Sequence, residues 1–204
     1  MTEDLEQRLG AAVLGESVAP DLAALRDSLA ARAAAEGLLD VAYAAVDTPL
    51  GEVIVFVTPR GLVRLSYPGE PVEAQLDRLA DDISPRILRA PERTDAVRRE
   101  LDAYFAGRLR RFETPVDWSL VRGFAGGVLR ATAQVPYGSV TTYRDVAAAA
   151  GSPRAYRAAG NALGSNPIPI VVPCHRVVHA GGGLGGYTGG LERKEFLLHL
   201  EGVR

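Results

Sequence analysis

The residue best suited to covalent chemistry is Cys174, the single cysteine among 204 residues. His175 follows it directly, and Pro173 ends the apolar run before it. We therefore expect the thiol at the start of a turn or short helix, where free amide N–H groups favour the thiolate. An ordinary thiol is only a few per cent ionised near neutral pH, so a histidine with a carboxylate such as Glu201 would help to remove its proton. These residues predict nucleophilic chemistry at sulfur.

The neighbours of Cys174 also permit an inert role. Valines on both sides, among them Val172 and Val178, suit a small buried hydrophobe with no chemistry. A lone thiol cannot form an internal disulfide and provides no multi-cysteine zinc pattern. We therefore expect neither a metal nor a cofactor, and the choice between nucleophile and filler stays open on local grounds.

Charge is distributed unevenly along the chain. The whole sequence has a formal net charge of −2, but residues 119–204 carry nine Arg or Lys against four Asp or Glu, whereas residues 1–118 carry 14 against 21. All three histidines also lie in the second half. A basic second half predicts an anionic partner there. The position of the histidines indicates that the chemistry lies in the same half.

The composition is that of an ordinary globular protein, with 47% hydrophobic and 24% charged residues, which excludes disordered and fibrous classes. No run approaches the roughly 18 apolar residues of a membrane span, and the acidic N-terminus is unlike a secretory signal. We expect a cytoplasmic protein with no membrane partner.

The first half predicts a helical extension followed by a small α/β domain. Residues 1–36 are rich in alanine, and the spacing of Leu22, Leu25 and Leu29 predicts an amphipathic helix. In the domain expected at residues 37–117, β-branched runs separated by Pro/Gly turns predict an antiparallel meander. Its predicted elements are the meander at 41–67, helices at 72–82 and 93–106, and a linker at 112–118.

The second half, residues 118–204, predicts a mostly helical domain. Thr142 and Asp145 have capping-box spacing, and Ser152 before a proline fits an N-cap. The two short helices that they begin have the proportions of a helix-turn-helix, although helical hairpins without a DNA role share them. The expected elements are helices at 120–135, 143–150, 154–163 and 191–201, a buried extended segment at 166–173 and a glycine-rich loop at 181–190.

Several motifs surround the cysteine. They are Pro-Cys-His-Arg-Val-Val at 173–178, Gly-Asn-Ala-Leu at 160–163, Asn-Pro-Ile-Pro at 166–169, Leu-Gly-Gly-Tyr-Thr-Gly-Gly-Leu at 184–191 and Val-Pro-Tyr-Gly at 135–138. Together they resemble the O6-alkylguanine-DNA alkyltransferases, closely over residues 124–202 and more loosely over 41–117. The resemblance implies an α+β protein. A ribonuclease-H-like domain with a small antiparallel sheet would precede a mostly helical domain that carries a helix-turn-helix and the active-site cysteine.

The resemblance also implies direct reversal of DNA damage. Such a protein, acting as a monomer from the minor groove, flips O6-alkylguanine or O4-alkylthymine out of duplex DNA and moves the alkyl group irreversibly to its own cysteine. Cys174 would be the acceptor, His175 would take the thiol proton through a water, and Glu201 would orient the histidine. Asn166 would brace the turn before the cysteine, and Tyr143 would rotate the nucleotide and assist the departure of guanine.

Further residues are implied at the DNA. Arg157 would fill the gap in the base stack, because a planar guanidinium can replace the lost base. The other implied residues contact the groove or line the base pocket: Ala155, Ala158 and Gly160 at the groove, and Tyr187, Thr188, Pro169 and Val177 in the pocket.

Some positions depart from the family pattern. Ala125 and Leu129 stand where most members carry glutamine and tryptophan, and Tyr156 is bulkier than the small residue common there. His179 and His199 match no motif and are expected to be surface or packing residues.

Three alternatives remain open. A non-catalytic lesion-binding relative would lack the cysteine, which counts against it. A cysteine hydrolase would use the adjacent Cys174 and His175 in an awkward geometry, and a plain helix-turn-helix regulator would not need the thiol.

Overall fold

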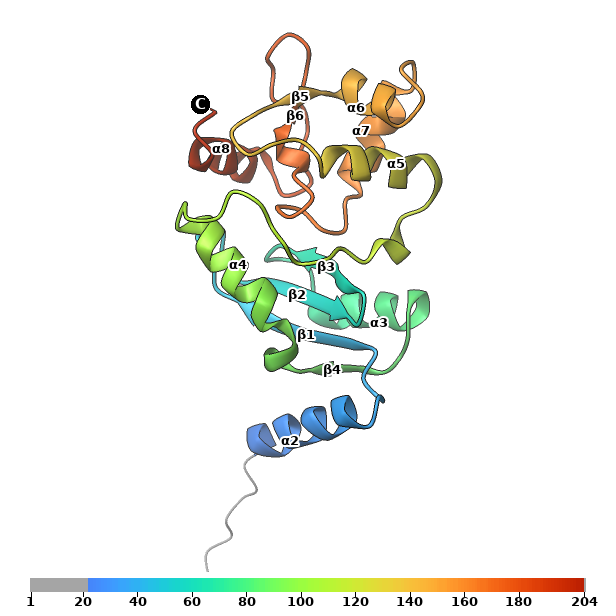
Figure 1. The fold of residues 1–204 in the computed structure, drawn as a ribbon, viewed down its shortest axis with the longest axis vertical. Coiled ribbons are helices and arrows are strands. Elements are labelled where there is room, and N and C mark those ends of the chain that lie inside the picture. Colours follow the sequence, from blue (N-terminus) through green and yellow to red (C-terminus); the bar gives the residue numbers. More distant parts are fainter. Residues whose placement is uncertain (1–21, 204) are drawn as a thin grey trace, which may run out of the picture.

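The computed structural model describes residues 22–203, and Figure 1 shows two regions: a sheet with its own helices and, above it in this view, a mostly helical region. The chain passes from the first region to the second only once, through residues 106–122. Within the described residues, no helix combines the length and the hydropathy that a membrane crossing requires.

The four-stranded sheet has the order β3-β2-β1-β4. Its first three strands form the predicted antiparallel meander, whereas β4 pairs in parallel with β1, so the expectation of a purely antiparallel sheet is wrong in this strand. The reason is the crossover helix α3 (Val72–Asp82), which carries the chain from β3 to the far edge of the sheet, so that β4 runs in the same direction as β3. The strands are β1 (Val41–Val46), β2 (Val53–Thr58), β3 (Gly61–Ser66) and β4 (Ile87–Arg89).

The helices of this region follow the predicted positions closely. Helix α3 (Val72–Asp82) has the predicted limits, and α4 (Asp95–Phe105) follows a 3-10 turn at Pro91–Thr94. The apolar stripe of α4 is buried, with Val97, Leu101 and Tyr104 in the core.

The helix before the sheet, α2 (Leu22–Ala35), leaves Leu25 and Leu29 exposed. Leu25 and Leu29 are 55% and 58% exposed, whereas Ala30 is buried in the core. The predicted leucine face is therefore wrong: α2 packs near β4 through its alanines, whose small side chains allow a close approach of the backbones.

The predicted linker is part of the fold, because it pairs with the edge strand β3. The amide of Leu62 donates to the carbonyl of Pro115 at 2.8 Å, and the amide of Asp117 donates to the carbonyl of Leu62 at the same distance. The helical region docks on the same edge, where the amide of Leu65 donates to the carbonyl of Pro167 at 2.8 Å. Strand β3 thus joins both halves.

The close pairing of residue 115 with β3 requires glycine at position 61. Gly61 has φ +131°, and a Cβ at this position would lie 2.0 Å from the carbonyl oxygen of Pro115. We expect Gly61→Ala to lower the free energy of unfolding by about 2–4 kcal/mol, since backbone strain and a backbone clash add. Gly69→Ala is the matched control, because Gly69 has φ +106° but nothing within 4 Å of the new Cβ. Urea denaturation of both variants measures the difference, and equal losses would contradict the clash.

The helical region contains every predicted helix, with shorter limits. The capping box is confirmed, since Thr142 and Asp145 bond each other's backbone amides. Ser152, in contrast, does not cap its helix: its carbonyl accepts from the amide of Ala155 in a turn, and Ala155 is the N-cap residue. The elements are α5 (Gly123–Thr132), α6 (Tyr143–Ala149), α7 (Tyr156–Gly164), α8 (Leu191–Leu200), the parallel pair β5 (Thr141–Thr142) and β6 (Val177–Val178), and 3-10 turns at Trp118–Leu120 and Cys174–Arg176.

The segment 166–173 is buried as predicted but folded into turns, not extended. The amide of Val172 donates to the carbonyl of Ile168 at 2.9 Å, and Ile170 takes the left-handed φ of +73°. The side chain of Asn166 closes these turns: its Oδ1 accepts from the amide of Ile168, and its Nδ2 donates to the carbonyl of Val172. This compact connection delivers the chain to Cys174.

Candidate active site

The thiol of Cys174 lies at the first residue of the 3-10 turn Cys174–Arg176, where the sequence predicts a turn start. The side chain is buried, with 5% of the residue exposed, and Asn166 Nδ2 lies 3.1 Å from Sγ. Burial raises the pKa of the Cys174 thiol, and the hydrogen bond from Asn166 and the charge of Lys194 oppose this rise only in part. The prediction that the turn favours the thiolate is therefore wrong for the resting protein. Burial raises the pKa of the thiol more than the amide groups of one short turn lower it.

A buried carboxylate contacts the two residues that follow the cysteine. Glu201 Oε1 is 2.9 Å from Nε2 of His175, and both carboxylate oxygens accept from Arg176 at 2.8 Å. The hydroxyl of Tyr104, on α4, donates to Oε1 at 2.7 Å. Burial by itself would raise the pKa of Glu201, but the hydrogen bonds from these three residues outweigh it and lower the pKa to about 2. The carboxylate is therefore ionised at neutral pH.

This carboxylate determines the protonation of His175. An ionised carboxylate only accepts hydrogen bonds, so Nε2 carries the hydrogen and Nδ1 carries the lone pair. Nδ1 is buried and has no hydrogen-bond partner among residues 22–203. Burial lowers the pKa of His175 and keeps the ring neutral. The result is a neutral imidazole with a free lone pair, which is the state that a proton acceptor needs.

Three buried residues around the site were not among the predicted site residues. Tyr104 comes from the sheet domain, and no local pattern could link it to Glu201. Arg176 belongs to the recognised motif, but its bidentate pairing with the carboxylate depends on the tertiary fold. Lys194 is fully buried, and its ammonium donates to the carbonyls of Val177 and Leu184, which anchors the glycine-rich loop beside the cysteine. As the single lysine of the sequence, it was the one of the three that could have been singled out.

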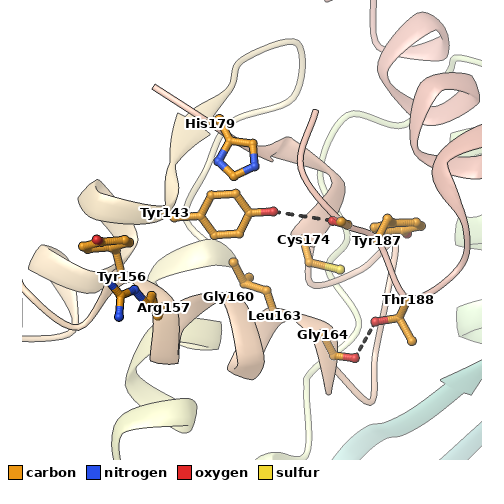
Figure 2. Close-up of a pocket in the computed structure, with 11 residues that line it drawn as sticks. Tyr143, Tyr156, Arg157, Gly160, Leu163, Gly164, Cys174, His179, Tyr187 and Thr188 are labelled. Atoms are coloured by element: carbon orange, nitrogen blue, oxygen red, sulfur yellow. Dashed lines mark hydrogen bonds between the residues drawn. The ribbon is translucent and has the colours of Figure 1, made fainter. Parts of the chain in front are cut away.

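A cavity of about 530 Å³ opens beside Cys174 (Figure 2). The ring of Tyr143 lies across it and packs against His179, with centroids 5.2 Å apart, and its hydroxyl donates to the carbonyl of Gly186 at 3.5 Å. The hydroxyl of Thr188 donates to the carbonyl of Gly164 and closes one wall. The cavity brings together the predicted residues Tyr143, Arg157, Gly160, Cys174, Tyr187 and Thr188, and adds Tyr156, Leu163, Gly164, His179 and Gly186.

The other predicted residues lie elsewhere. Pro169 lines a second cavity, of about 460 Å³, which also reaches Cys174. Val177 is fully buried in β6 and is not among the residues that line either of these two cavities. Ala155 and Ala158 lie at the start of α7, with Ala158 exposed to solvent. His199 is exposed, as predicted, whereas His179 is exposed at the cavity and packs on Tyr143.

The part of the chain that the structure describes contains no group of three or more His, Cys, Asp or Glu side chains able to hold a metal ion. The side chains that line the cavity include the thiol of Cys174, the imidazole of His179 and the hydroxyls of Tyr143 and Tyr187.

Known proteins match both halves of the chain. Residues 41–118 match the family described as 6-O-methylguanine DNA methyltransferase, ribonuclease-like domain, and residues 123–203 match the DNA binding domain of the same enzyme family. This chain belongs to that family. The methylated-DNA--protein-cysteine methyltransferase of Methanosarcina barkeri is 36% identical over 160 residues, which are 78% of this chain and 96% of the relative. That of Mycolicibacterium paratuberculosis is 40% identical over 163 residues, or 79% and 92% of the two chains.

Solved structures of family members share the fold. The crystal structure of Mycobacterium tuberculosis O6-methylguanine methyltransferase is 36% identical, has a TM-score of 0.67, and covers 79% of this chain and 92% of its own. The structure of the M. tuberculosis protein in complex with DNA is 35% identical with the same TM-score, and the match covers 78% and 92%. The family's architecture confirms the predicted α+β class, with a sheet domain followed by a mostly helical domain.

Proposed function

We propose that this methyltransferase-family protein repairs DNA by moving an alkyl group from O6 of guanine to Sγ of Cys174. One observation carries the proposal: the only thiol of the chain lines a cavity, and the residue that follows it is a buried histidine paired with a buried carboxylate. The names of the relatives describe transfer of a methyl group from DNA to a protein cysteine, which is the same chemistry. Alkylated thymine at O4 would present the same group to the sulfur.

The transfer needs a proton path away from the thiol. Because burial raises the pKa of the Cys174 thiol, a base must accept its proton as the sulfur attacks. Nδ1 of His175 takes this proton through a water, and Glu201 stabilises the imidazolium that forms. Glu201 is held in place for this role by its hydrogen bonds with Arg176 and Tyr104.

Bond making and breaking occur at the alkyl carbon. The sulfur forms a bond to this carbon while the bond from carbon to O6 breaks, and its electron pair stays on guanine. The hydroxyl of Tyr143 donates a hydrogen bond to the departing base, and guanine finally gains a proton that balances the one lost by the thiol. The product is a thioether, which water does not cleave, so each protein molecule acts once.

The base must leave the duplex to reach the sulfur. Arg157 lies exposed at the cavity edge beside Tyr156, with its guanidinium carbon 5.7 Å from the centre of that ring. In the proposed complex, α7 enters the minor groove through Ala155, Ala158 and Gly160, and Arg157 takes the place of the flipped nucleotide. The M. tuberculosis relative in complex with DNA supports a DNA partner, and in this proposal a single copy of this chain binds a duplex.

The deciding experiment is intact mass spectrometry after incubation with duplex DNA that contains O6-methylguanine. We expect the protein mass to rise by one methyl group, on Cys174, and the reaction to stop after one equivalent of DNA. No rise would leave a lesion-binding protein, and repeated turnover of a small ester or peptide would indicate a cysteine hydrolase.

A second prediction separates flipping from chemistry. We expect Arg157→Ala to slow repair of duplex DNA about 10–100-fold, because the cost of extruding the base is no longer offset. Reaction with free O6-benzylguanine should stay within about twofold of wild type, since no duplex has to open. Arg154→Ala, an exposed arginine just before α7, is the control for general loss of positive charge. Equal losses on both substrates would show that Arg157 has no part in flipping.

A further inference from the structure

A tyrosine of the sheet domain contacts the active-site loop. Tyr67 follows β3 directly, and its Oη lies 2.7 Å from Oη of Tyr187, with ring centroids 6.2 Å apart. Tyr187 lines the cavity beside Cys174, and both tyrosines line the second cavity that reaches the same cysteine. The two phenols therefore connect the sheet domain to the acceptor sulfur, although the sequence motifs involve only Tyr187.

The surroundings hold these two phenols in one arrangement. The guanidinium of Arg193 lies 5.0 Å from the centre of the Tyr67 ring, and its Nη1 donates to the carbonyl of Gly189 at 2.7 Å. Gly189 packs between the rings, because a Cβ there would lie 2.7 Å from Cε2 of Tyr67 and 2.8 Å from Cε1 of Tyr187. The ring positions are thus determined by packing as well as by the hydrogen bond.

In the hydrogen bond between Tyr67 and Tyr187, one hydroxyl donates and the other accepts. Burial raises the pKa of Tyr67 and of Tyr187, so both phenols keep their hydrogens. The cation at Arg193 draws electron density from the Tyr67 ring, which makes the Tyr67 hydroxyl the better donor. When Tyr67 donates, Oη of Tyr187 is the acceptor and the Tyr187 hydrogen is left for another partner. Cys174 lines both cavities together with Tyr187 (Figure 2), so its sulfur is a candidate acceptor for this hydrogen, most of all once it is negatively charged.

We propose that Tyr67 is a positioning residue that orients the Tyr187 hydroxyl as a second hydrogen-bond donor to the Cys174 thiolate, beside Asn166. Hydrogen bonds to a charged form stabilise that form, and hydroxyls in a chain polarise one another. The sheet domain then takes part in the chemistry through a single phenol. This inference rests on the proposed function, since it concerns the ionisation of the alkyl acceptor.

The test uses Tyr67→Phe, which keeps the ring and its packing and removes only the hydroxyl. Iodoacetamide alkylates only ionised thiols at useful rates, and the single cysteine makes the mass shift unambiguous. We expect the midpoint of the rate against pH to rise by about 0.5–1 unit, with the rate at high pH unchanged. Reaction with free O6-benzylguanine at neutral pH should slow about 3–10-fold. A purely structural role would leave the pH midpoint unchanged. A pH profile that coincides with that of wild type overturns the proposal.

Two further variants sharpen this test. Tyr43→Phe makes the same change in β1, where Tyr43 stacks on Phe56, and should leave the profile unaltered. Arg193→Gln removes the cation beside Tyr67 and should raise the midpoint by a smaller amount, which provides a second measurement should Tyr67→Phe fold poorly.

A double variant tests the route of the effect. Because Tyr67 acts through Tyr187, the variant with both tyrosines changed to phenylalanine should have the midpoint of Tyr187→Phe alone. Additive shifts would overturn the relay. The iodoacetamide measurement needs no DNA, so a wild-type protein that fails to accept a methyl group would refute the proposed function and still leave the Tyr67 relay to be judged by this shift.

Discussion

Replacement of Cys174 by serine is expected to abolish alkyl transfer completely. Serine has nearly the same shape as cysteine, but its hydroxyl ionises far less readily. Intact mass spectrometry with O6-methylguanine DNA should therefore show no methylated protein even after long incubation. The variant should keep its fold, because the side chain is small and the Asn166 amide can donate to oxygen as well as to sulfur.

Binding provides the control for this variant. The affinity of Cys174→Ser for duplex DNA that contains O6-methylguanine, measured by fluorescence anisotropy at one stated salt concentration, should stay within about twofold of wild type. Retained methyl transfer would place the acceptor elsewhere in the chain. Unchanged cellular function of Cys174→Ala would instead favour a helix-turn-helix regulator.

Removal of the buried carboxylate should have the second largest effect. In Glu201→Gln, the guanidinium of Arg176 stays buried with no carboxylate to pair with, and the hydrogen bonds with His175 and Tyr104 weaken. Breaking a buried ion pair by removing one partner costs about 3–5 kcal/mol, which urea denaturation can measure. We also expect transfer to Cys174 to slow by about 100-fold or more, because the imidazolium loses its counter-charge.

Glu195→Gln is the matched control for this change, since Glu195 lies exposed on α8. It should alter neither stability nor transfer measurably. A Glu201→Gln protein as stable as wild type would contradict the role of this carboxylate as the centre of the buried network.

The same carboxylate predicts how stability depends on pH. The pKa of Glu201 falls from its ordinary 4.5 to about 2 in the folded protein, so the unfolded chain binds the proton more readily. The stabilisation is therefore present above about pH 4.5 and is lost as the pH falls towards about 2. In Glu201→Gln, the free energy of unfolding should depend less steeply on pH in this interval.

The sequence alone determined much of the local structure. The meander, the limits of α3, the capping box at Thr142 and the turn at Cys174 follow from patterns within a few residues, since propensity and capping act over short distances. The short motifs around the cysteine also identified the family and most residues of its cavity. Longer-range packing overrode local patterns in α2, where Ala30 is buried while Leu25 and Leu29 face solvent, and in the parallel strand β4, which has only three residues.

Only the tertiary structure decided the electrostatics of the site. The direction of the pKa of Cys174 depends on how much protein excludes water from the sulfur, and the segments that do so are distant in sequence. Tyr104 reaches Glu201 from 97 positions away, and Tyr67 reaches Tyr187 from 120 positions away. Short sequence patterns cannot predict these contacts, because only the folding of the chain brings such distant side chains within hydrogen-bonding distance.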